Sequence, residues 1–200
     1  MNSRADQAAR AAFQIESEAI KDTAAVMDYI AFGKAVDALA GAARIGASGC
    51  GHSGICCQHF AHLMCCIEKP ARFISPAEAV HGAMGFIQKG DVLVLASRGG
   101  KTAELIPIME IARRKNAVIV TVTENRNSPL SKGADIVLPM VVHHETDKYN
   151  SQGTSSFVAL SAVFDALQAA LIEETEYQNE QFALIHPGGA VGDRLNRKTE

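Results

Sequence analysis

The residues from Ser97 to Glu104 combine groups that would bind an anion with a group that would move a proton. A run of aliphatic residues leads into Gly99 and Gly100 and then into a helix-forming segment, a pattern typical of a buried parallel strand joined tightly to a helix. At that turn, backbone N–H groups, the hydroxyls of Ser97 and Thr102 and the positive end of the helix would hold a phosphate. Glu104, expected one turn inside the helix, would be the base that removes a proton next to a carbonyl.

Two other stretches have a similar character. Residues 49–54, Gly-Cys-Gly-His-Ser-Gly, predict a glycine-rich turn, with Ser53 near the start of the next helix. Thr154, Ser155 and Ser156 place three hydroxyls in the first turn of a long helix. Parallel sheets bind ligands outside the carboxyl ends of their strands, so we expect the three stretches to converge on one pocket.

Short strands that alternate with helices must position these groups. The apolar patterns predict strands near 44–48, 71–74, 92–97, 117–123 and 134–140. Helices are expected between them, above all over 53–66, 101–115 and 153–175. This alternation indicates an α/β protein with a parallel sheet covered on both faces.

An N-terminal helical segment, residues 1–42, precedes this core. One long helix is expected from Ala5 to Ile30, and a second near 34–39 after a break at Gly33. The α/β core and a C-terminal helix then occupy 43–200. At 200 residues the chain is long enough for one well-buried domain, so we expect a single domain over 1–200.

The composition excludes several classes of protein. Lys and Arg number 19 against 22 Asp and Glu, a formal net charge of −3, and no basic cluster is present for nucleic acid. No uninterrupted apolar run reaches membrane-spanning length, and the N-terminus has no secretory core. We therefore expect a cytoplasmic protein that binds neither nucleic acid nor membrane.

The five cysteines fall in one short region, at positions 50, 56, 57, 65 and 66. An odd number that includes two adjacent pairs argues against a disulfide framework. His59, His62 and Cys66 lie at helical spacing i, i+3, i+7, which leaves a metal site open as an alternative. Buried free cysteines that pack as small apolar residues are the favoured interpretation, with no metal bound.

Three segments together resemble the sugar isomerase (SIS) domain, and within it the arabinose 5-phosphate isomerase branch of the KpsF/GutQ type. They are the turn at 49–54, the stretch from Ser97 to Glu104, and residues 182–192, Phe-Ala-Leu-Ile-His-Pro-Gly-Gly-Ala-Val-Gly. The resemblance implies a flavodoxin-like three-layer αβα sandwich with five parallel strands. It also implies a sugar-phosphate pocket at a subunit interface of a homodimer or homotetramer, with no metal or redox cofactor. Many relatives carry paired CBS modules after this domain, which we expect this chain, ending at Glu200, to lack.

The resemblance also implies roles for individual residues in an aldose-ketose isomerisation through an enediol. The catalytic candidates are Glu104, Glu145 in the polar, exposed-looking segment 141–146, His186, and His52. The substrate-binding and phosphate-binding candidates are Ser53, Ser97, Gly99, Gly100, Thr102, Thr154, Ser155, Ser156 and His81.

Two residues depart from the family pattern. His52 stands where the isomerases carry lysine, and Gly99 stands where they carry serine. The main hypothesis is a sugar-phosphate isomerase acting on a pentose phosphate such as arabinose 5-phosphate. A non-catalytic module that senses sugar phosphates is the alternative, and a structural or metal protein built on the cysteine-rich helix is a third.

Overall fold

Five parallel strands form the sheet in the computed structural model, which describes residues 1–196. They are β1 (Ile45–Gly49), β2 (Ala71–Phe73), β3 (Val92–Ala96), β4 (Val118–Thr123) and β5 (Ile136–Pro139). Their order is β2-β1-β3-β4-β5, and each neighbouring pair is parallel. This is the flavodoxin-like order, which confirms the fold class predicted from the sequence.

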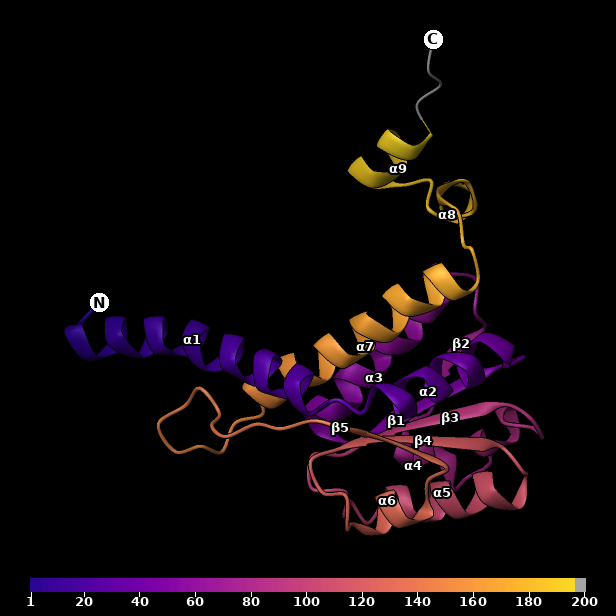
Figure 1. Cartoon of the computed structure of the whole chain (residues 1–200), viewed down its shortest axis with the longest axis horizontal. Coiled ribbons are helices and arrows are strands. Elements are labelled where there is room, and N and C mark those ends of the chain that lie inside the picture. The colour runs from indigo at the N-terminus through magenta and orange to yellow at the C-terminus, as the bar shows by residue number, and fades with distance from the viewer. Residues whose placement is uncertain (197–200) are drawn as a thin grey trace.

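Helices cover both faces of the sheet (Figure 1). One face carries α2 (Tyr29–Gly41), α3 (Gly51–Cys66) and α7 (Ser155–Glu174). The other carries α4 (Pro76–Ala79), the 3-10 helix η1 (Ala83–Phe86), α5 (Leu105–Arg114) and α6 (Pro129–Gly133). Two clusters of buried apolar side chains fill the spaces between these layers. The predicted three-layer sandwich is therefore confirmed.

The register of the sheet brings the loops of interest to one edge. Gly49 at the end of β1 pairs with Ala96 at the end of β3, and Thr123 of β4 pairs with Pro139 of β5. The loops that follow β1, β3, β4 and β5 consequently leave the sheet side by side. Every residue of β1 and β3 is buried, as expected for strands covered on both faces.

Helix α7 anchors the larger of the two apolar clusters. Its Phe164 is fully buried against Phe60 of α3, with ring centroids 4.5 Å apart. Helix α7 is long and apolar enough to cross a membrane, and it is the one helix in residues 1–196 with that length and composition. Leu160, Phe164 and Leu167 are buried in the core, so α7 behaves as the core helix of a globular unit.

The N-terminal segment differs from the prediction in where it breaks. Helix α1 (Ser3–Val26) ends earlier than expected, and α2 begins at Tyr29 and runs through Gly33. The Asp28 carboxylate accepts hydrogen bonds from the N–H groups of Ile30 and Ala31, both at 3.1 Å. This N-cap starts a new helix, which is why the break falls at Asp28 and not at the glycine.

Both ends of the chain extend beyond the layers (Figure 1). Only Ala19 and Thr23 are buried in the 24 residues of α1, and Phe13 on the same helix is 78% exposed. At the other end, α8 (Asn179–Ile185) and α9 (Gly189–Leu195) form a separate arm, on which Leu184 is 79% exposed. Large apolar side chains thus face outward on both extensions.

Candidate functional site

The loop between β3 and α5 has the form of an anion cradle. The Ser97 and Thr102 hydroxyls lie 2.8 Å apart, and the Gly100 N–H donates to the Ser97 hydroxyl at 3.1 Å. Gly100 has φ +64°, and a Cβ there would collide with the Ser128 side chain, so glycine is required. Gly99 is exposed beside it. The loop therefore keeps two hydroxyls together beside the exposed Gly99, an arrangement compatible with phosphate binding.

Glu104 lies just outside α5, whereas the sequence predicted it one turn inside. The residue is the exposed N-cap of a helix that begins at Leu105. Pro107 has no N–H to donate backward, so it fits the first turn of a helix and the helix begins shortly before it. The carboxylate is close enough to Cys50 that, after burial, its charge also raises the pKa of that thiol. Glu104 therefore lies in the neighbourhood of Cys50, on the turn that follows β1.

That turn, between β1 and α3, is compact and carries His52. A Cβ on Gly49 would come within 2.9 Å of the Ser53 carbonyl group, so only glycine fits. The exposed His52 ring lies edge-on to Phe157 of α7 at a centroid distance of 6.4 Å. A Cβ on Gly153 would approach its Nδ1 to 2.7 Å. His52 therefore rests against the start of α7, beside the other loops.

Glu145 is buried, which corrects the expectation that residues 141–146 form an exposed polar loop. It is only 4% exposed, and one carboxylate oxygen accepts from Arg98 Nη1 at 2.7 Å. The other accepts from the N–H groups of Thr154 and Ser156 at 2.8 and 3.1 Å. Burial acts to raise the pKa of Glu145, but hydrogen bonds from Ser156, Ser155 and Thr154 outweigh it and leave the pKa lowered.

The start of α7 is therefore occupied by an internal carboxylate. The buried Ser155 hydroxyl donates to the His144 carbonyl and to Glu145, and the Thr154 hydroxyl is 3.2 Å from the same oxygen. These donors were predicted to line the phosphate pocket, but here they hold Glu145. The negative charge that a helix N-terminus favours is supplied by the chain itself. The start of α5, next to the hydroxyls of Ser97 and Thr102, is the remaining candidate for binding an external anion.

Neither His186 nor His81 joins these groups within one chain. His186 ends α8, and α8 is tied to the far end of α3, where Gln181 Nε2 donates to Glu68 at 3.0 Å. The 16 residues of α3 span about 24 Å from the carboxyl edge of the sheet, which separates His186 from the loops there. His81 is exposed in the turn after α4, and no contact in residues 1–196 links it to the other candidates.

The comparisons with known proteins agree with this architecture. The model of the SIS domain matches residues 38–170. The chain belongs to the SIS domain family. Arabinose 5-phosphate isomerase KdsD of Pseudomonas aeruginosa is 38% identical over 162 residues, which are 81% of this chain and 50% of that protein. Arabinose 5-phosphate isomerase KpsF of Escherichia coli is 36% identical over 148 residues, 74% of this chain and 47% of that protein. This SIS domain chain thus spans about half the length of the curated relatives it matches.

Solved SIS-type structures superpose closely on it. A candidate sugar-phosphate isomerase from Listeria monocytogenes aligns with a TM-score of 0.90 at 38% identity, covering 94% of this chain and 100% of that one. A protein of E. coli CFT073 in complex with A5P aligns with a TM-score of 0.87 at 25% identity, covering 94% and 100%.

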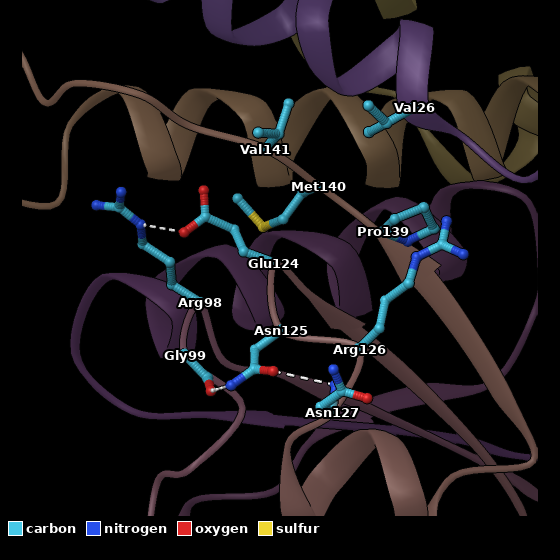
Figure 2. A pocket seen from close by; sticks show the side chains of 10 residues that line it. All are labelled: Val26, Arg98, Gly99, Glu124, Asn125, Arg126, Asn127, Pro139, Met140 and Val141. Carbon is cyan, nitrogen blue, oxygen red and sulfur yellow. Dashed lines mark hydrogen bonds and ion pairs between the residues drawn. The ribbon is translucent and has the colours of Figure 1, made fainter.

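Sequence reasoning missed three residues of this SIS domain that shape the site. Arg98 and Glu124 line a cavity of about 540 Å³ at the carboxyl edge of β3 and β4, where Figure 2 shows them paired. Gly153 makes room for the His52 ring. Charged residues directly after two buried strands were a visible signal for Arg98 and Glu124, whereas the packing of Gly153 had none.

The cysteine-rich helix α3 serves mainly as packing. Burial raises the pKa of the Cys56 thiol to about 11; the hydrogen bond with the Ser161 hydroxyl lowers it slightly and the Asp165 charge raises it further, so the thiol is unreactive near neutral pH. His59 lies 3.7 Å from Asp165, and His62 lies 3.6 Å from the Cys66 sulfur. Across the described residues no three potential metal ligands group together.

Proposed function

We propose that this SIS domain interconverts an aldose phosphate and a ketose phosphate, of the arabinose 5-phosphate and ribulose 5-phosphate type. The observation that carries the proposal is the pair of hydroxyls of Ser97 and Thr102 just before α5, with the exposed N-cap Glu104 beside them. The names of the relatives support it, since the matched proteins are arabinose 5-phosphate isomerases and one aligned structure holds A5P.

The proposed chemistry assigns one task to each part of the site. Ser97, Thr102 and the Gly100 region hold the dianionic phosphate, with Ser53 on the neighbouring turn. Glu104 removes the proton from C2 of the aldose and returns it to C1 through an enediol, while His52 and His186 together move protons between the two oxygens. Phosphate binding remote from the reacting carbons orients them for this transfer.

We further propose a cytoplasmic homo-oligomer whose partner subunit completes the site. An apolar groove of about 410 Å³ runs between α1, α2 and α7, and the large exposed apolar side chains of α1 and α8 have no cover in residues 1–196. Exposed patches of this kind are typical of subunit interfaces. Glu104 and His52 are exposed in one chain, so a second subunit would exclude water from the site and bring His186 to it. The five free cysteines suit a reducing compartment.

Turnover is tested directly with the whole chain. The protein is incubated with arabinose 5-phosphate, ribose 5-phosphate and glucose 6-phosphate in deuterated water, and ketose and carbon-bound deuterium are followed by NMR. We expect arabinose 5-phosphate to be converted to a ketose phosphate that carries deuterium on carbon. Binding of the sugar phosphates without any turnover would contradict the isomerase proposal.

That contrary result would favour the second candidate, a module that senses sugar phosphates. His52 in place of the family lysine and Gly99 in place of the family serine are the observations that favour it. Such a module would keep the cradle of Ser97 and Thr102 and lack the positive charge beside the base.

Subunit complementation tests whether His186 acts across the interface. Glu104→Gln and His186→Ala are each expected to be nearly inactive alone. Mixed oligomers, formed by co-refolding or co-expression, should regain activity, because one of their sites contains both native residues. Activity is measured on mixtures at a fixed total concentration. Mass spectrometry verifies that the oligomers are mixed. If their activity does not exceed that of the separate variants, His186 does not act in the partner subunit's site.

A further inference from the structure

Arg98 has an unusual set of contacts for a residue of a phosphate-binding loop. Its Nε donates to Glu124 at 2.7 Å, its Nη1 to Glu145 at 2.7 Å, and its Nη2 to the Val142 carbonyl at 2.9 Å. All three guanidinium nitrogens thus bind acceptors on segments that follow other strands. The side chain is directed away from the cradle formed by its neighbours, so it does not itself hold the phosphate.

The contacts of Arg98 close into a ring. Glu124, which Arg98 binds, accepts in turn from the Val142 N–H, so both backbone groups of Val142 are bonded within the ring. The Arg98 carbonyl accepts from the Glu124 N–H at 3.0 Å and from the Thr123 hydroxyl at 2.9 Å. A planar guanidinium suits this role, because its fork of donors fixes the direction as well as the distance of each acceptor.

The ring connects the two parts of the site that must stay aligned. Arg98 lies next to Ser97 in the loop that forms the cradle. Its partner Glu145 binds the first N–H groups of α7, and the start of α7 carries Gly153 and Phe157, on which His52 rests. A displacement of Glu145 would therefore shift His52, and a displacement of Arg98 would shift the loop that carries Ser97 and Thr102.

We propose that Arg98 is a positioning residue that aligns the phosphate cradle with His52 through Glu145, without touching the substrate. The inference rests on the proposed isomerase function. Arg126, in the same cavity wall, is the matched contrast: Figure 2 shows it near Pro139, away from the Arg98–Glu124 pair. Within residues 1–196 it makes no hydrogen bond or ion pair, and it is exposed.

The main experiment compares Arg98→Lys with Arg126→Lys, each keeping its charge. A lysine ammonium cannot bind three acceptors in one plane, so kcat/KM of Arg98→Lys should fall on the order of 10²-fold, the usual effect of a displacement of about 1 Å in a reacting geometry. Most of the fall should be in kcat, while the affinity for inorganic phosphate, measured by calorimetry, changes little. Arg126→Lys should stay within about twofold of the native protein, which is the scatter expected at a site without contacts.

Chemical rescue separates positioning from a loss of folded protein. Arg98→Ala is assayed with and without guanidinium chloride at low millimolar concentration, with sodium chloride as the ionic control and circular dichroism to confirm folding. Added guanidinium should restore part of kcat. The proposal is overturned if Arg98→Lys keeps native kinetics, or if phosphate affinity falls as far as kcat/KM, which would make Arg98 a direct ligand. A native protein without turnover would instead refute the isomerase function, so the two failures are distinguishable.

Discussion

Replacing Glu104 by glutamine is expected to lower kcat by about 10³-fold, within the range of 10²- to 10⁴-fold that a positioned general base contributes. The amide keeps the size and polarity of the side chain but cannot accept a proton from carbon. The Glu104 side chain is exposed and makes no hydrogen bond in the described residues, so the substitution removes no stabilising side-chain contact. The melting temperature should therefore stay close to that of the native protein.

Glu110→Gln provides the matched control for this prediction. Glu110 is likewise an exposed glutamate, but it lies within α5, more than a turn further along the helix than the cradle. Steady-state rates with arabinose 5-phosphate and the exchange of the C2 proton with deuterated water are measured for both variants. If Glu104→Gln still exchanges that proton at a native rate, Glu104 is not the base, and the carboxylate only contributes charge to the site.

The form of the loop between β3 and α5 was predictable because local sequence determines it. A buried aliphatic strand, two glycines and flanking hydroxyls restrict the chain to a tight turn whatever surrounds it, and Ser97, Gly100 and Thr102 lie together as expected. The parallel sheet was predictable for a similar reason, since β-branched runs that alternate with helices leave few alternatives to it. The position of Glu104 differs from the prediction by about one turn because Pro107 fits only in the first turn of α5, so the helix begins at Leu105.

Long-range contacts determine those features of the candidate site that could not be predicted from the sequence. Glu145 stands among histidines, Asp147 and Lys148, so a solvated segment was expected. Arg98, 47 residues away in the loop after β3, makes its burial favourable. With Glu145 buried there, the hydroxyls of Thr154 and Ser155 at the start of α7 bond to its carboxylate, a contact that the sequence did not predict. His186 matches a family motif, but the position of the α8–α9 arm depends on contacts that one sequence does not reveal.

Glu145→Ala is expected to destabilise the fold by about 3 kcal/mol, at the lower end of the range for removing one member of a buried ion pair. The loss is large because the N–H groups of Thr154 and Ser156 and the buried Ser155 hydroxyl lose their acceptor together. It is not larger, because Arg98 keeps Glu124 as a partner. Chemical denaturation at one fixed subunit concentration measures it, since assembly would otherwise shift the midpoint.

The pH dependence of stability tests whether the charge of Glu145 causes this stabilisation. Its folded-state pKa is lowered below the ordinary value of 4.5, so its contribution is fully present above pH 4.5 and is lost as the pH falls through the folded pKa. The free energy of unfolding of Glu145→Ala should therefore decline less than that of the native protein on acidification from pH 5. Glu174→Ala, at the exposed far end of α7, should retain the native pH dependence. Parallel acid profiles for Glu145→Ala and the native protein would show that Glu145 stabilises α7 by packing alone, and the role of Arg98 as the link between the two loops would then lack its electrostatic basis.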